Sequence, residues 1–118
     1  PGQQRNYTAI WDDVAVVTFS EFGRTSRENG SLGTDHGQAT FSLVAGGTVN
    51  GGVYNCDAAT WESGAMFSVD GQYLSHRSDY RALFWELLRD HMGANPSSSD
   101  TVFPGYSSAG LTELNLFT

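Results

Sequence analysis

Apolar side chains are concentrated in a few short runs along the chain. Residues 14–19 form a continuous, β-branched apolar run, which is typical of a strand buried on both faces in a parallel sheet. Residues 41–45 predict a second strand, and the turn signal at 50–52 predicts a short returning strand at 53–54. The polar, glycine-containing segment 20–38 between the first two strands predicts a long loop.

A helical period follows these strands in the sequence. Residues 78–92 predict the main helix, with Ser78 as N-cap and Gly93 as the C-terminal stop. Residues 95–100 predict a flexible linker, and residues 101–118 predict a tail that packs against the body. The expected buried face of the helix consists of Tyr80, Leu83, Phe84, Leu87, Leu88 and His91.

Strand, loop, strand and helix predict an α/β fold with a short, mostly parallel sheet and one main helix. Residues 1–118 are expected to form a single partial domain, with the strand–loop–strand unit at 12–54. One helix covers one face of such a sheet and leaves the other face open. We therefore expect the open face to pack against an N-terminal half outside this sequence or against a second copy of the chain.

Charge and composition narrow the range of partners. The net charge of −7 disfavours general binding to nucleic acid or to anionic membranes. No run approaches the roughly 20 apolar residues of a membrane span. The single cysteine, Cys56, excludes an internal disulfide and is expected to be a small, semi-buried side chain. Because the sequence begins with Pro1, we expect a processed or truncated product.

Candidate chemistry lies in the segment between the first two strands. Glu21 and Arg24 follow the first strand, where α/β sheets bind ligands, and Asp35 and His36 end the same segment. Carboxylates with an imidazole are suitable ligands for zinc, manganese or a similar divalent ion. Calcium is a further possible ion, for which the carboxylates alone would be ligands. Arg24 would then bind or orient an anion. Alternatively, Glu21 is a solvated strand end, Asp35 closes a turn, and His36 is a hydrogen-bonded loop histidine.

Five segments in order resemble a large uncharacterised bacterial family whose members look like sulfatases and alkaline phosphatases and are often exported by a twin-arginine signal. The segments are SEFGRT at 20–25, GTDHG at 33–37, AGGTVNGGVY at 45–54, DYRAL at 79–83 and VFPG at 102–105. The resemblance implies the C-terminal part of an alkaline-phosphatase-like sandwich, from a protein three to four times longer than this chain. It also implies an exported or periplasmic location.

The same resemblance implies roles for individual residues. In catalytic relatives a strand ends in Asp-His-Gly, whose Asp and His bind one metal, and a later histidine binds a second metal. Glu21 falls at that Asp position and His36 at the later histidine. Phe22 replaces the first histidine, and a phenyl ring cannot ligate a metal. The nucleophile of the relatives comes from the N-terminal half, so no catalytic residue is assigned here.

Two hypotheses follow. In the first, the chain is the C-terminal part of a metal-dependent phosphatase or sulfatase, inactive alone, with Glu21, Asp35 and His36 on the metal. In the second, it is a non-catalytic α/β module of the same fold, acting in binding or assembly, with a decayed metal site. They differ in geometry: a metal site brings His36 and Glu21 to one point, whereas a decayed site places Arg24 there. Self-association is expected in either case.

Overall fold

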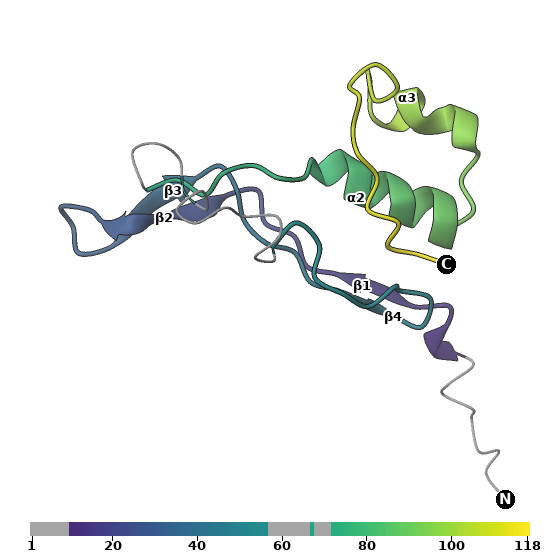
Figure 1. Ribbon diagram of the computed structural model, residues 1–118, viewed down its shortest axis with the longest axis horizontal. Helices are drawn as coiled ribbons and strands as arrows, with labels where there is room; N and C mark the ends of the chain where they lie inside the picture. The colour runs from purple at the N-terminus through teal and green to yellow at the C-terminus, as the bar shows by residue number, and fades with distance from the viewer. Residues whose placement is uncertain (1–9, 57–66, 68–71) are drawn as a thin grey trace, which may run out of the picture. The chain divides into compact units, whose positions relative to one another are not determined.

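The computed structural model describes residues 10–56, 67 and 72–118. These residues form a mixed α/β structure, whose elements are traced along the chain in Figure 1. They divide into two compact units, and each is described by itself. The first unit comprises residues 1–17, 44–52 and 79–118, and the second comprises residues 18–43 and 53–78. In this described part of the chain, no helix is long and apolar enough to cross a membrane.

The first unit contains a two-stranded sheet. Strand β1 (Ala15–Val17) pairs with β4 (Val44–Gly46), and the pairing is antiparallel with Val16 opposite Ala45. The expectation of a parallel sheet is therefore wrong for these strands. Parallel strands need a crossover connection, usually a helix, whereas the chain between β1 and β4 is itself a hairpin. The expectation of burial on both faces also fails, since Val16 is 51% exposed.

Helix α2 (Tyr80–Glu86) lies within the predicted helix and continues as a π-helical turn over Leu87–His91. Its N-cap is Asp79 and not Ser78, because the Asp79 carboxylate accepts a hydrogen bond from the backbone N–H of Arg81 at 2.9 Å. The Arg81 guanidinium also donates to both oxygens of this carboxylate, at 3.0 and 2.9 Å. These hydrogen bonds hold the pKa of Asp79 below its ordinary value.

The linker predicted at 95–100 is helical in part. It contains a 3-10 turn at Pro96–Ser98, capped by the Asn95 side chain, and the start of α3 (Ser99–Val102). Asp100 in α3 accepts hydrogen bonds from the backbone N–H and the hydroxyl of Ser107, at 3.0 and 2.5 Å. These contacts fold the chain after α3 back toward that helix. They also hold the pKa of Asp100 below its ordinary value.

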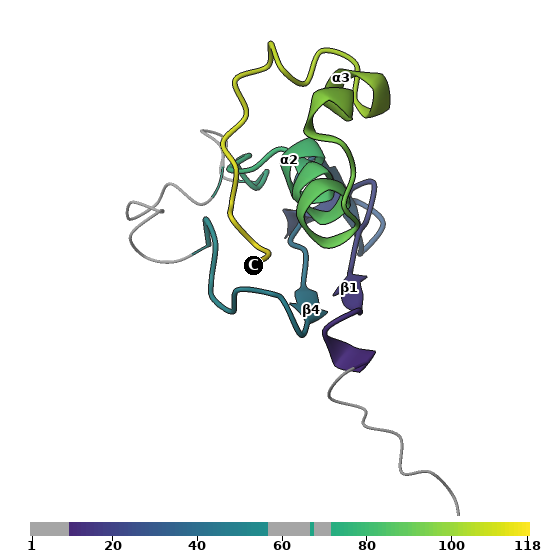
Figure 2. The same cartoon turned by 90° about the vertical axis from the view of Figure 1, so that its right-hand side faces the viewer.

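The C-terminal tail packs into the first unit beside residues 48–50, as Figure 2 shows. Leu116 accepts a hydrogen bond from the backbone N–H of Asn50 at 2.8 Å, and Thr118 donates to Thr48 at 3.0 Å. Val49 and Phe117 form an antiparallel bridge. Leu116 and Phe117 are 4% and 7% exposed, so the tail closes the core of this unit.

Glu86 attaches the tail to α2. Its side chain is fully buried, and its two carboxylate oxygens accept the backbone N–H groups of Leu114 and of Leu116, the latter at 2.7 Å. The observed buried face of α2 is Ala82, Leu83, Trp85 and Glu86. The predicted face is therefore wrong in part: Tyr80 is 56% exposed, because the tail covers the other side of the helix.

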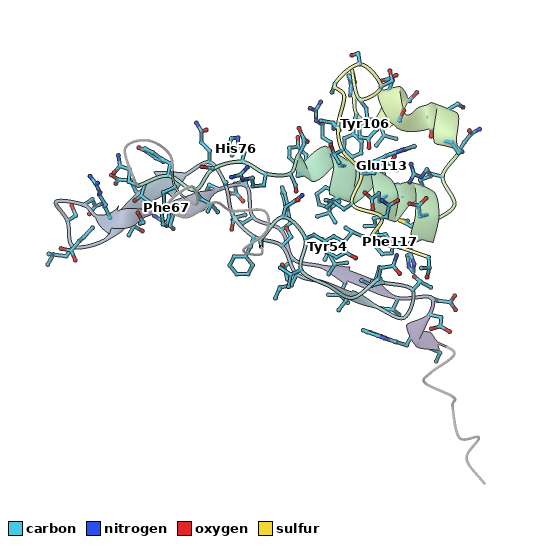
Figure 3. All side chains as sticks on the ribbon, viewed as in Figure 1. Tyr54, Phe67, His76, Tyr106, Glu113 and Phe117 are labelled. Atoms are coloured by element: carbon cyan, nitrogen blue, oxygen red, sulfur yellow. The ribbon has the colours of Figure 1, made fainter. Side chains whose placement is uncertain are left out.

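Two further contacts hold the tail segment that precedes Leu114. The Arg89 guanidinium pairs with Glu113 and with Asp90, and these carboxylates raise the pKa of Arg89. The ring of Tyr106 packs 5.8 Å from that of Trp85, measured between centroids. Figure 3 labels Tyr106, Glu113 and Phe117, which follow the tail past α2.

The N-cap gives a pH-dependent prediction. Asp79→Ala should lower the free energy of unfolding by about 1 kcal/mol at neutral pH, since it removes a side-chain cap. Asp79→Asn keeps the capping oxygen and removes the charge, so we expect a smaller loss. Because the folded pKa of Asp79 is lowered, its charge stabilises above the unfolded pKa of about 4, and this stabilisation is lost as the pH falls through the folded value.

Urea denaturation of wild type and Asp79→Asn between pH 2 and 7 measures this effect. The difference between the two proteins should be full at neutral pH and shrink below about pH 4. A difference that stays constant over the whole range would contradict a charged cap.

Candidate functional site

The four candidate residues lie on one β-hairpin in the second unit. Strand β2 (Gly23–Glu28) pairs antiparallel with β3 (Thr34–Gly37), so the long loop predicted at 20–38 is wrong over most of its length. These strands were not predicted, because their residues are mostly polar and lack the alternation of apolar and polar side chains that indicates a strand. Their pairing places Arg24 opposite His36 and Gly23 opposite Gly37.

The hairpin is irregular near the candidate residues. Arg24 pairs with His36 and Glu28 pairs with Thr34, so β2 holds two more residues than β3 over the same stretch. The buried Thr25 side chain fills the irregularity: its hydroxyl accepts the backbone N–H of Asp35 at 3.2 Å. This contact fixes the backbone of Asp35 beside that of Thr25.

The hairpin loop is ordered by one side chain. Asn29 Oδ1 accepts the backbone N–H groups of Ser31 and Gly33 at 3.0 and 3.1 Å, and its Nδ2 donates to Asp35 Oδ1 at 2.8 Å. Asp35 is therefore oriented toward the loop by a hydrogen bond.

A stack of three side chains covers one face of the hairpin. The His36 imidazole lies on the Phe22 ring with centroids 3.9 Å apart and an interplanar angle of 19°. The Arg24 guanidinium carbon lies 5.4 Å from the centroid of the same ring. Arg24 also donates to the carbonyl oxygen of Thr34 at 2.8 Å, which ties its guanidinium to β3.

The register explains why these three meet. Phe22 and Arg24 are two residues apart along one extended segment, and His36 is directly opposite Arg24, so all three share a face. Asp35 and His36 are consecutive in β3, and consecutive side chains in a strand point to opposite faces. The hairpin thus brings His36 to Phe22 and Arg24 and directs Asp35 away from them.

This conformation does not assemble a metal ligand set from the predicted residues. Over the residues that the structure describes, no three His, Cys, Asp or Glu side chains form a group that could hold a metal ion. His36 uses its ring face on Phe22, and Asp35 accepts from Asn29. Glu21 is exposed before β2. Metal binding by Glu21, Asp35 and His36, with Arg24 on an anion, remains a prediction.

The other two histidines and the cysteine have different surroundings. His91 lies in the first unit, where Nδ1 is 3.2 Å from the Thr48 hydroxyl and the ring packs 5.7 Å from Phe117. His76 is exposed. Cys56 is exposed, so the expectation of a semi-buried thiol is wrong. No strand forms at 53–54, so the expectation of a short returning strand there is wrong.

Sequence reasoning missed Glu86, whose buried carboxylate organises the first unit. It stands on a helix among apolar neighbours, and its partners are 28 and 30 residues further along the chain. The one sequence feature that could have indicated this buried role is that Glu86 is a charged residue within the apolar stretch 82–88.

Comparison with known proteins gives one match. A family model described as a protein of unknown function, DUF1501, matches residues 6–65, which is 60 of the 118 residues. The match includes the whole β2–β3 hairpin and its ring stack. No curated protein and no solved structure matches.

Proposed function

Since the chain belongs to the DUF1501 family of proteins of unknown function, we propose that it is a non-catalytic α/β module that acts in binding or assembly. Alkaline-phosphatase-like and sulfatase-like proteins have a metal site at this place. In the proposal, the stack of Phe22, Arg24 and His36 replaces that site. The resemblance of the segments at 20–25 and 33–37 to those proteins supports the choice of place.

The observation that carries the proposal is the stacked pair of His36 and Phe22. An imidazole held face to face on a phenyl ring at 3.9 Å is fixed in orientation by contact with carbon atoms. The Arg24 guanidinium beside it adds a positive charge, which opposes the approach of a divalent cation. Both features favour a structural role for the three side chains over metal ligation.

Exposure of the predicted ligands supports a second candidate function. Glu21, Asp35 and His36 are all exposed, so a divalent ion could reach each of them from solvent. The chain would then be the C-terminal part of a metal-dependent phosphatase or sulfatase, with the nucleophile supplied by another segment. Asp35 and His36 are consecutive in β3 and point to opposite faces, so the backbone there and the hydrogen bond from Asn29 to Asp35 would have to rearrange first.

Metal titration separates the two candidates. We expect calorimetry with Zn²⁺ and Mn²⁺ to show no stoichiometric binding to the wild-type chain and no difference between wild type and His36→Ala. Phe22→His removes the ring on which His36 stacks and supplies an imidazole in its place, so this variant should gain zinc affinity. Stoichiometric binding to wild type that His36→Ala abolishes would overturn the proposal in favour of the hydrolase half-site.

A further inference from the structure

An asparagine followed by a glycine occupies the turn of the β2–β3 hairpin. Asn29 and Gly30 come directly after Glu28, the last residue of β2, and residues 30–33 are exposed to solvent. Asparagine is a thermolabile residue, because its side-chain amide can react with the backbone nitrogen of the next residue. Glycine in that next position has no Cβ to hinder the nitrogen. A Cβ at Gly30 would meet no atom within 4 Å, so no neighbouring group shields this side of the turn either.

The closed turn holds the Asn29 side chain by three hydrogen bonds. Its Oδ1 accepts the backbone N–H groups of Ser31 and Gly33 at 3.0 and 3.1 Å, and its Nδ2 donates to Asp35 Oδ1 at 2.8 Å. Rotation of the amide toward the Gly30 nitrogen breaks these bonds. The closed turn therefore slows a reaction at Asn29, and opening of the turn permits it.

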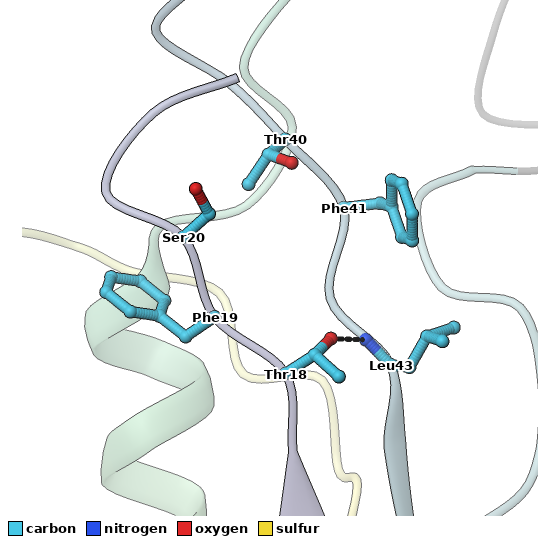
Figure 4. Close-up of a pocket in the computed structure, with 6 residues that line it drawn as sticks. All are labelled: Thr18, Phe19, Ser20, Thr40, Phe41 and Leu43. Carbon is cyan, nitrogen blue, oxygen red and sulfur yellow. Dashed lines mark hydrogen bonds between the residues drawn. The ribbon is translucent and has the colours of Figure 1, made fainter. Parts of the chain in front are cut away.

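Opening of this turn has a low cost and stays local. Leu32 has a φ of +59°, in the left-handed region that is unfavourable for a residue with a Cβ. Its side chain is 85% exposed, so opening loses little apolar burial. The base of the hairpin is closed by separate bonds (Figure 4): the Thr18 N–H donates to the Leu43 carbonyl at 2.9 Å, and the Thr18 hydroxyl accepts the Leu43 N–H at 2.8 Å.

A second Asn-Gly pair, at residues 50 and 51 of the first unit, is held by the tail. Asn50 Nδ2 donates to the carbonyl oxygen of Asn115 at 2.8 Å, and the Asn50 backbone N–H donates to that of Leu116 at 2.8 Å. Leu116 is 4% exposed. Freeing Asn50 thus requires release of the tail from a core, whereas freeing Asn29 requires only the opening of an exposed turn.

We propose that Asn29 is a site of spontaneous deamidation, and that its product loosens the hairpin turn. The Gly30 nitrogen forms a bond to Asn29 Cγ, the Cγ–Nδ2 bond breaks, and the displaced nitrogen leaves with the Gly30 amide proton as ammonia. The cyclic imide that results takes up one water. The hydroxyl of this water adds to one imide carbonyl, its proton goes to the imide nitrogen, and the bond between them breaks. The product is aspartate or isoaspartate at position 29.

The product replaces a hydrogen bond by a repulsion. Asn29 Nδ2 lies 2.8 Å from Asp35 Oδ1, and a carboxylate oxygen in its place has no proton to donate. Two like charges at that separation repel each other. The Asp35 backbone cannot retreat easily, because its N–H donates to the buried Thr25 hydroxyl at 3.2 Å. The turn therefore loses its side-chain bond to β3. This inference goes beyond the proposed function, since it assigns a covalent modification to the hairpin that carries the ring stack.

Incubation of the full chain at mildly alkaline pH, followed by tandem mass spectrometry of its peptides, tests the site. We expect the acid at position 29 to accumulate before the acid at position 50, with isoaspartate detected by enzymatic methylation. Gly30→Ala hinders the attacking nitrogen and keeps the turn, so it should react severalfold more slowly. Asp35→Ala removes one of the bonds that hold the amide, so it should react faster. Earlier reaction at Asn50, or a rate that neither variant changes, would overturn the inference.

The aspartate product can also be made directly. Asn29→Asp keeps an oxygen for the Ser31 and Gly33 N–H groups but removes the donor to Asp35. We expect these two amides to exchange with water at least about tenfold faster than in wild type, as measured by NMR. Asn29→Asp combined with Asp35→Asn interchanges donor and acceptor and should restore the wild-type rates. Unchanged exchange in Asn29→Asp, or no recovery in the double variant, would overturn the proposed effect of the product. Neither measurement involves a metal, so failure here leaves the proposed function to its own test.

Discussion

Replacement of Glu86 by alanine should lower the free energy of unfolding by about 3 kcal/mol or more, since two buried N–H groups lose their acceptor. The carboxylate is fully buried and accepts the N–H groups of Leu114 and Leu116. In the variant these groups are left without a partner beside a cavity of the size of the lost side chain. Glu86→Gln retains one carbonyl oxygen and should lie between alanine and wild type.

Urea denaturation followed by far-ultraviolet circular dichroism measures the loss. Glu113→Ala is the matched control, because Glu113 is also a carboxylate in the contact between helix and tail, but it pairs with Arg89 and its side chain is 37% exposed. Its loss should stay below about 1 kcal/mol, as for other solvent-exposed ion pairs. Hydrogen exchange should show the amides of Leu114 and Leu116 protected in wild type and in Glu113→Ala, and unprotected in Glu86→Ala. Equal stability of the two alanine variants would contradict the role of Glu86.

A methyl group at Gly23 should disrupt the hairpin. A Cβ there would lie 1.8 Å from the carbonyl oxygen of Ala39 and 2.7 Å from its carbonyl carbon, and both are backbone atoms. Because these atoms cannot rotate away as a flexible side chain does, the strands must move apart. We expect Gly23→Ala to cost about 3 kcal/mol, at the upper end of overpacking effects, and to loosen the pairing of Arg24 with His36.

Gly30→Ala is the control for this substitution. A Cβ at Gly30 would meet no atom within 4 Å, and its φ is not in the left-handed region. That variant should equal wild type in stability or exceed it slightly, because alanine restricts the unfolded chain. Amide hydrogen exchange in β2 and β3 reports the effect locally. Matching exchange rates in the two variants would show that Ala39 does not crowd Gly23.

The helix was predictable from sequence, whereas its buried face was not. A period of 3.6 residues over 78–92 is a local signal, and α2 with its π-helical turn lies inside that range. The buried face depends on the tail: Tyr106 packs on Trp85, and Leu116, 30 residues further along the chain, binds Glu86. Helical periodicity alone carries no information about such a distant partner.

Strands β1 and β4 were located from the sequence, but their direction was not. Apolar runs at 14–19 and 41–45 indicate β1 and β4, although each strand is only three residues long. Direction depends on the segment between them, and that segment forms a hairpin from polar residues with an irregular register. The pairing of β2 with β3 depends on backbone hydrogen bonds and on the buried hydroxyl of Thr25. Hydrophobic patterns in the sequence do not reveal strands of this kind.

For the candidate site, the sequence indicated the residues and the register determined their arrangement. Phe22 at a histidine position was visible in the sequence as the feature that weakens a metal site. That His36 stacks on this same ring follows from the pairing of Arg24 with His36. Strand alternation then separates Asp35 from His36, which a loop interpretation of 20–38 could not anticipate.

The most direct test of the proposed function is the NMR signal of the His36 ring. Carbon–proton correlation spectra resolve the three histidines, and His76 and His91 serve as internal references. We predict His36 ring protons shifted upfield by the Phe22 ring, a loss of this shift in Phe22→Leu, and no change when Zn²⁺ is added. An unshifted His36 signal that moves or broadens stoichiometrically with Zn²⁺ would contradict the account and identify His36 as a metal ligand.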